Sequence, residues 1–134
     1  MSIEKGREVI RIEAEAVAAL EERIGPEFER AVELIYQSKG RVIVTGIGKS
    51  GIIGKKIAAT LTSTGTPASY LHPAESMHGD IGIVMKGDVL IAVSKSGGRD
   101  EVFNLIPLIK RLGVPIIAIT GNPESSLAQQ SDVT

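Results

Sequence analysis

The amino-acid sequence predicts a three-layer α/β fold, a doubly wound parallel sheet with helices on both faces and two further helices in front of it. Short apolar runs recur along the chain, as expected of strands that are buried on both faces, and helical segments alternate with them. In a sheet of this kind ligands bind beyond the carboxyl ends of the strands, so a site is expected in the loops that follow the runs. Four runs are predicted as strands: Arg41–Thr45, Ala68–Leu71, Asp88–Ser94 and Val114–Thr120.

The composition disfavours several classes of function. The 134 residues include 15 Lys and Arg against 16 Asp and Glu, and 43% are hydrophobic, which is typical of one soluble domain. The near-balance of charge disfavours nucleic-acid binding by phosphate neutralisation. The lack of cysteine excludes a disulfide framework and fits a reducing compartment. Because the chain has neither a long apolar run nor a signal-peptide block, we expect a cytoplasmic protein that binds no nucleic acid and no membrane.

Residues 1–39 are predicted to form an N-terminal arm of two helices. Gly25 and Pro26 separate the two, since Pro suits the first position of a new helix. Both helices carry apolar residues at helical spacing, so the arm can pack on a partner and we expect a homo-oligomer. The stripes are Ile10, Ala14, Val17 and Ile24 in the first helix, and Phe28, Val32 and Ile35 in the second.

Residues 40–134 are predicted to form one domain, because no repeat or linker interrupts them. A glycine-rich segment, Gly46–Gly54, leads from the first strand into a helix predicted over Lys55–Leu61. The third strand is followed by a helix carrying Val102, Ile106 and Ile109, and a further helix is predicted to start over Ser125–Gln130. Strands and helices therefore alternate throughout this part of the chain.

The first glycine loop, Gly46–Gly51 (GIGKSG), follows a strand and precedes a helix. Its glycines let backbone N–H groups turn toward an anion, the helix N-terminus adds partial positive charge, and Lys49 adds a full charge. A dinucleotide site would need an acidic residue at the end of the second strand, where His72 and Pro73 stand. A nucleotide-triphosphate loop would need glycine in place of Ile43. The loop favours a single phosphate, with an ordinary structural turn as the alternative.

The loop after the third strand, Ser94–Gly98, offers a second candidate anion site. Two hydroxyls, a glycine turn and the start of a helix supply neutral donors that suit a sugar phosphate. Serines at such positions also cap helices, so a purely structural role for Ser94 and Ser96 stays open. Residues 62–66 repeat the hydroxyl and glycine composition before the second strand, where an ordinary loop is the alternative.

Three titratable side chains near these loops are candidates for chemistry. His72 and His78 lie in the loop after the second strand and suit proton transfer or metal binding, with surface histidines as the alternative. Two histidines alone are a weak metal signal, because a closed site needs three or four ligands. Glu101 lies in the first turn of the helix after Gly98, where the helix dipole favours any acidic residue. A carboxylate there could also move a proton between adjacent carbons of a sugar.

Four segments together resemble one known family. They are GIGKSG (46–51), TSTGTPASYLHPAESMHGD (62–80), SKSGGRDEV (94–102) and ITGNPESSLAQQSDV (119–133), and they are similar to the sugar isomerase (SIS) domain of bacterial D-arabinose 5-phosphate isomerases. The resemblance implies a flavodoxin-like fold and the reversible isomerisation of D-ribulose 5-phosphate and D-arabinose 5-phosphate through a cis-enediol. It also implies a place in the synthesis of 3-deoxy-D-manno-octulosonate for lipopolysaccharide or capsule, a homotetramer, and no required cofactor.

The same resemblance implies roles for individual residues. Lys49 and Glu101 match catalytic positions, and His72 matches a histidine linked to inhibitory zinc. The substrate-binding positions are Gly48, Ser50, Gly65, Thr66, His78, Ser94 and Ser96. Relatives usually carry Ser or Thr at Arg99 and often Asn at Lys95, so two extra cations are expected beside the phosphate.

The resemblance also sets expectations about the end of the chain. Relatives continue past the last residues with a sheet strand, a helix bearing a further catalytic histidine, and often paired regulatory domains of the cystathionine-beta-synthase type. We therefore expect a SIS domain that is incomplete at its C-terminus and has little turnover alone. The alternatives are a non-catalytic sugar-phosphate sensor, since the same fold serves as a ligand-binding module in regulators, and a dinucleotide-binding domain.

Overall fold

Four parallel strands form the single sheet of the computed structural model, which describes residues 1–134. The strands are β1 (Val42–Thr45), β2 (Ala68–Leu71), β3 (Val89–Val93) and β4 (Ile116–Ile119), in the order β2-β1-β3-β4. All neighbouring pairs are parallel, so the predicted α/β class and all four predicted strands are confirmed. From β1 the chain first goes outward to β2 and then crosses to β3 and β4 on the other side. The boundary between β1 and β3 is therefore the topological switch point of the sheet.

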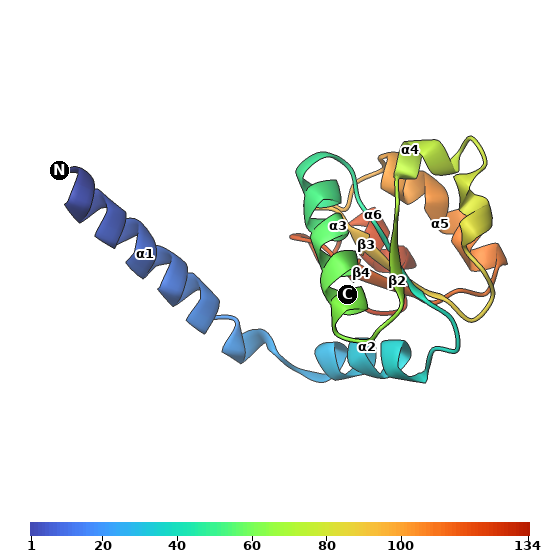
Figure 1. Ribbon diagram of the computed structural model, residues 1–134, viewed down its shortest axis with the longest axis horizontal. Helices are drawn as coiled ribbons and strands as arrows, with labels where there is room; N and C mark the ends of the chain where they lie inside the picture. The colour runs from blue at the N-terminus through green and yellow to red at the C-terminus, as the bar shows by residue number, and fades with distance from the viewer.

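Alternate residues of the strands point to two separate apolar layers, which explains why each strand is apolar throughout. Ile43 packs on one face with residues of α5 (Glu101–Arg111) and α6 (Ser126–Gln130). Its neighbours Val42 and Val44 pack on the other face, against α2 (Pro26–Gln37) and α3 (Gly48–Ser63). Figure 1 shows α3 and α5 on opposite sides of the sheet, which confirms the three layers.

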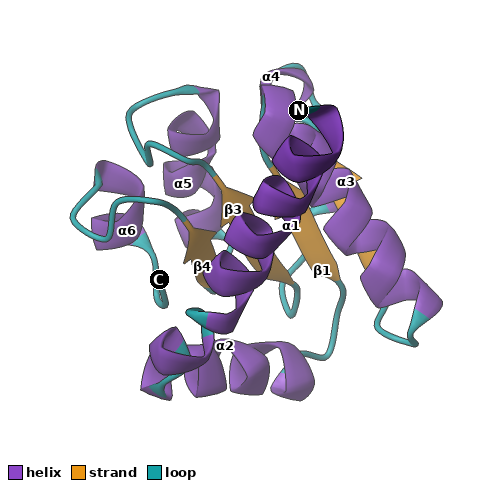
Figure 2. Ribbon diagram, turned by 90° about the vertical axis from the view of Figure 1, so that its left-hand side faces the viewer, coloured by secondary structure: helices purple, strands orange, loops and turns teal.

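The N-terminal arm is helical as predicted, and its first helix extends away from the rest of the chain. None of the residues of α1 (Ser2–Ala18) is buried, and a 3-10 turn (Glu21–Arg23) connects it to α2. Figure 1 shows α1 standing clear of the sheet, and in Figure 2, turned by 90°, the helix projects toward the viewer in front of the sheet. Neither α1 nor any other helix is long and apolar enough to cross a lipid bilayer.

The packing face of α2 differs in part from the predicted stripe. Phe28 and Val32 are 54% and 49% exposed, whereas the residues that pack on the sheet are Ala31, Leu34 and Ile35. The helix lies at the end of the molecule away from α4 (Pro73–Ser76), as Figure 1 shows. Helical spacing predicts an apolar stripe, but the angle at which the helix meets its neighbours selects the residues that are buried.

The glycine-rich segment after β1 is mostly helix, not loop. We predicted the helix from Lys55, but α3 begins at Gly48. Gly51 and Gly54 are buried because α3 approaches the sheet closely: a Cβ on Gly51 would lie 2.7 Å from the carbonyl oxygen of Gly46, and one on Gly54 would lie 3.3 Å from Cγ1 of Val44. These glycines therefore allow α3 to pack closely on the sheet. In the sequence, such glycines look the same as glycines of a loop.

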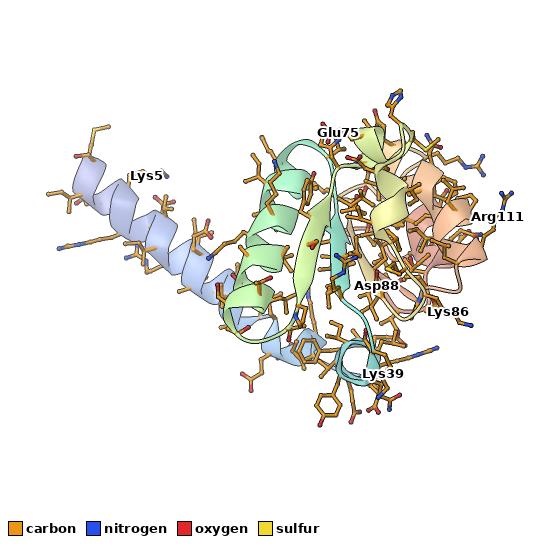
Figure 3. The ribbon with its side chains drawn as sticks, turned by 45° about the vertical axis from the view of Figure 1, so that its right-hand side comes forward. Lys5, Lys39, Glu75, Lys86, Asp88 and Arg111 are labelled. Carbon is orange, nitrogen blue, oxygen red and sulfur yellow. The ribbon has the colours of Figure 1, made fainter.

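Asp88 stabilises the amino-terminal ends of the strands, where β1 and β3 begin. Its buried carboxylate accepts hydrogen bonds from the backbone N–H groups of Arg41 at 2.7 Å and Met85 at 2.9 Å. Figure 3 shows Asp88 well below Glu75 of α4, toward Lys39. The carboxylate thus satisfies backbone donors at the amino ends of the strands, whereas the loops predicted to bind a ligand lie at the carboxyl ends.

The last residues run beside β4. Val133 forms a parallel bridge with Ile117, and its carbonyl oxygen accepts a hydrogen bond from the N–H of Ala118 at 2.8 Å. The carboxylate of Asp132 accepts from the N–H of Ile116 at 2.8 Å. These bonds continue the parallel pattern of the sheet beyond β4.

Candidate functional site

A cavity of about 400 Å³ opens where β1 and β3 end. It lies at the topological switch point, the usual ligand position in an open parallel sheet. Its volume falls in the range of small-molecule sites. The lining residues come from the loops after these two strands and are mostly polar: Ile47, Ser50, Val93, Ser94, Lys95, Ser96 and Asp100.

Glycine shapes the β1 side of the cavity. A Cβ on Gly46 would lie 2.9 Å from the carbonyl carbon of Ser50 and 3.0 Å from the carbonyl oxygen of Val93. Gly48 has a φ of 59°, in the left-handed region that glycine adopts at no steric cost. The buried carbonyl oxygen of Gly46 accepts a hydrogen bond from the Tyr70 hydroxyl at 2.6 Å. The chain can thus turn sharply from β1 into α3 and place Ser50 in the first turn of the helix.

Hydrogen bonds within the loop shape the β3 side. The Ser94 hydroxyl oxygen accepts from the N–H of Gly97 at 3.1 Å and donates toward a carboxylate oxygen of Asp100 at 3.3 Å. The other oxygen of Asp100 accepts from two backbone N–H groups at the start of α5. Asp100 therefore caps α5, and the serines do not, which contradicts the capping alternative for Ser94 and Ser96. Both serine side chains instead line the cavity.

The chemistry of the cavity suits a small anion joined to a polar body. Ser50 in the first turn of α3 and Asp100 directly before α5 line the cavity, so the partial positive ends of both helices are near it. Three serines supply hydroxyl donors, and Lys95 supplies a positive charge that offsets the negative charge of the Asp100 carboxylate. Such a combination binds a phosphate well and leaves room for a few further polar atoms.

Comparison with known proteins agrees with this geometry. The profile of the SIS domain matches residues 34–134. The chain belongs to the SIS-domain family. Its sequence is 53% identical over 131 residues to arabinose 5-phosphate isomerase KdsD of Pseudomonas aeruginosa, covering 98% of this chain and 40% of that protein. The corresponding protein of Escherichia coli is 52% identical over 96% of this chain and 39% of its own length. This SIS domain thus spans about 40% of the curated relatives that it matches.

Two solved structures with the same fold contain bound ligands. An Escherichia coli protein in complex with arabinose 5-phosphate superposes with a TM-score of 0.84 at 36% identity, over 99% of this chain and 72% of that one. The Vibrio vulnificus NanR protein complexed with ManNAc-6P superposes with a TM-score of 0.75 at 25% identity, over 92% of this chain and 48% of that one. Both proteins hold phosphorylated sugars.

The structure of this SIS domain brings together part of the predicted site. Ser50, Ser94 and Ser96 line one cavity although two strands and two helices separate Ser50 from the other two in sequence. Gly48 and Lys49 are the first residues of α3, directly before Ser50, and the side chain of Lys49 is exposed.

Sequence reasoning missed Asp100 as a lining residue. Glu101, the predicted acid, is the exposed first residue of α5, while its neighbour Asp100 lines the cavity. An Asp just before an apolar helical stripe is a typical N-cap, and that signal could have identified it. Of the two extra cations, Lys95 lines the cavity and Arg99 does not; the Arg99 guanidinium lies 5.9 Å from the ring centre of Phe103.

The two histidines lie at the same edge of the sheet but outside this cavity. His72 directly precedes the short helix α4 and is partly buried, and its Nδ1 atom has no hydrogen-bond partner. His78 is exposed in the turn that follows α4. No group of three or more His, Cys, Asp or Glu side chains is positioned to hold a metal ion in this chain, so His72 as a zinc ligand stays a prediction.

Gly65 and Thr66 lie away from the other predicted substrate residues. They follow α3 and precede β2, so they stand at the amino end of the strands, whereas the cavity lies at the carboxyl ends. They line a separate hollow beside α2 together with Ser38 and Gly40. In a parallel sheet the loops before and after a strand lie on opposite edges, so one chain cannot bring these two residues to its own phosphate cavity.

Proposed function

We propose that this SIS domain is the isomerase domain of a protein that interconverts D-ribulose 5-phosphate and D-arabinose 5-phosphate. One observation carries the proposal: a polar cavity at the switch point, lined by Ser50, Ser94 and Ser96, lies in a chain that is 53% identical to a named arabinose 5-phosphate isomerase. The product would supply the synthesis of 3-deoxy-D-manno-octulosonate for lipopolysaccharide or capsule in the cytoplasm.

In the mechanism we propose, the cavity holds the phosphate and the sugar extends toward the starts of α3 and α5. Glu101 removes a proton from one carbon of the sugar and returns it to the neighbouring carbon. Loss of the proton leaves an enediolate, whose negative charge on oxygen the ammonium group of Lys49 stabilises. Protonation of that oxygen gives the neutral cis-enediol, and the neighbouring hydroxyl loses its proton as the second carbon is protonated, which moves the carbonyl group. His78 orients the sugar from the turn after α4. Residues 94–98 and the start of α3 fix the phosphate, so the reacting carbons are held in place.

We propose that the reaction requires no cofactor. The proton leaves one carbon and arrives at its neighbour, and no electrons are gained or lost overall, so an acid and a base are sufficient. Zinc bound through His72 would act as an inhibitor, with further ligands from outside this chain, because no cluster of three such side chains surrounds His72.

Deuterium incorporation tests the proposed reaction. With D-ribulose 5-phosphate in D₂O and the chain extended past Thr134, we expect NMR to show arabinose 5-phosphate that carries deuterium at C2, because the base exchanges its proton with solvent. Residues 1–134 alone are expected to exchange slowly. Exchange without net product would still report proton abstraction. Tight binding of sugar phosphates with no exchange by the extended chain would instead favour a non-catalytic sugar-phosphate sensor.

We further propose that the protein self-associates through α1. Ile3, Ile10 and Val17 lie seven residues apart on one face of this helix and are 71%, 69% and 66% exposed. Apolar residues at this spacing form the seam of paired helices. By resemblance, the expected assembly is a tetramer.

Light scattering after size-exclusion chromatography tests this self-association. We expect the chain to form an assembly larger than a monomer, and Ile10→Glu to reduce its mass because a charge would enter the apolar seam. Arg11→Glu, on the polar side of α1, is the control and should leave the mass unchanged. A monomeric wild-type chain would contradict the proposal.

A further inference from the structure

Tyr70 of β2 contacts the β1 loop through its ring and its hydroxyl, and the proposed mechanism gives it no role. Its ring packs against α3 where the helix lacks side chains: a Cβ on Gly54 would lie 3.5 Å from the ring carbons. The ammonium group of Lys55 lies 5.1 Å from the ring centre. The ring of this β2 residue thus packs against α3, including the side chain of Lys55, and its hydroxyl is directed at the loop that follows β1.

The hydroxyl of Tyr70 is the hydrogen-bond donor to the carbonyl oxygen of Gly46, at 2.6 Å. No backbone N–H group donates to this oxygen, and Gly46 is buried. Without the tyrosine hydroxyl, a buried carbonyl would lack a partner, which proteins avoid. The position of the Gly46 peptide therefore depends on Tyr70.

The Gly46 peptide in turn supports the cavity. It lies between Ser50 and Val93, with so little space that a Cβ would come within 3.0 Å of the backbone of both residues. Ser50 in the first turn of α3 and Val93 at the end of β3 both line the cavity, on its two sides. A shift of a few tenths of an ångström at Gly46 would therefore alter the distance between the Ser50 and Ser94 sides.

The Tyr70 hydroxyl stays protonated and can therefore donate this hydrogen bond. Burial first, and then the negative charge of Glu75, raise the pKa of Tyr70 above its ordinary value of 10.0. The hydroxyl consequently keeps its proton throughout the neutral and mildly alkaline range, where a phenolate could not donate to a carbonyl.

We propose that Tyr70 is a positioning residue for phosphate: its hydroxyl holds the Gly46 carbonyl and thereby sets the position of Ser50 opposite Ser94. This inference rests on the proposed function, because it assumes that the cavity between β1 and β3 binds the phosphate of the substrate.

Tyr70→Phe tests the inference, because it removes the hydroxyl and keeps the ring. Tyr36→Phe is the matched control, since Tyr36 is the other of the two tyrosines of the chain and is 87% exposed. Dissociation constants for D-arabinose 5-phosphate and for inorganic phosphate are measured by calorimetry well below the melting temperatures. We expect Tyr70→Phe to weaken both ligands by about 3- to 10-fold, the loss of one hydrogen bond, and Tyr36→Phe to match the wild type.

Each outcome decides the matter. A merely structural role would lower the melting temperature of Tyr70→Phe and leave the dissociation constants of the folded protein unchanged, and that result would overturn the inference. If the wild-type chain binds neither ligand, the proposed function fails and the inference fails with it. If Tyr70→Phe does not fold, ¹³C NMR of the wild type decides: saturating phosphate should shift the Cζ resonance of Tyr70 and not that of Tyr36, and an unmoved Tyr70 resonance would refute the idea.

Discussion

Glu101→Gln is expected to slow deuterium exchange into the sugar phosphate by about 10²- to 10⁴-fold, the usual contribution of a general base. Glutamine has nearly the same size as glutamate but cannot accept the proton. Glu101 is exposed at the start of α5, and Asp100, not Glu101, caps that helix, so the substitution leaves the helix intact. The affinity for arabinose 5-phosphate should therefore change little, and the loss should appear in the rate of exchange.

The neighbouring carboxylate provides the sharpest comparison. Asp100 lines the cavity, but both of its oxygens are engaged, one with Ser94 and the other with the start of α5. Asp100→Asn should reduce stability, because the amide caps α5 less well, and should change the rate constant of the bound complex little. Glu29→Gln, on the exposed side of α2, is the control. If Asp100→Asn abolishes exchange while Glu101→Gln exchanges normally, the general base is Asp100 and the role assigned to Glu101 is wrong.

Gly97→Ala is expected to lower the free energy of unfolding by about 2 to 4 kcal/mol, through backbone strain and overpacking. Gly97 has a φ of 61°, and an added Cβ would lie 2.5 Å from Cβ of Ser125 and 2.8 Å from Oγ1 of Thr120. Ser125 caps α6, and the carbonyl oxygen of Gly97 accepts from the N–H of Leu127 at 3.0 Å, so the strain would spread to that helix. Because the N–H of Gly97 also bonds to Ser94, phosphate affinity should fall as well.

Urea denaturation of Gly97→Ala and Gly98→Ala measures this difference. A Cβ on Gly98 would meet only the Ser96 hydroxyl, at 3.4 Å, and Gly98 does not have a positive φ. We expect Gly98→Ala to change the free energy of unfolding by less than about 1 kcal/mol. Equal destabilisation by the two adjacent substitutions would show that the space around Gly97 is not the cause.

The strands were predictable because each is a short run of consecutive apolar residues. Val42, Ile43 and Val44 are apolar in succession, which fits only a strand covered on both faces, and the two layers take alternate residues. The helix after β1 was less predictable. Gly51 and Gly54 look like loop residues in the sequence, but close contact with Gly46 and Val44 requires them within a helix.

The candidate site was predictable only where local chemistry was sufficient. Ser94 and Ser96 follow a strand directly, and Ser50 lies in a glycine-rich turn, so position after a strand identified all three. Asp100 was missed because its distance to Ser94 depends on how the intervening turn folds. Gly65 and Thr66 were predicted by resemblance to form a substrate loop, and in this chain they stand before β2, at the ends of the strands opposite the cavity.

The sequence by itself determined the order of strands and helices, the two apolar layers of the sheet and the chemical types of the loop residues, because these depend on spacing along the chain. Only the tertiary structure decided that the loops after β1 and β3 share one cavity, that Tyr70 reaches the Gly46 carbonyl, and that Ala31 and Leu34 replace Phe28 and Val32 in the packing of α2. The spacing of residues along the chain fixes which way neighbouring side chains point relative to one another. Contacts between segments far apart in the sequence depend instead on which strands and helices become neighbours in space, and on the distance and angle at which they pack.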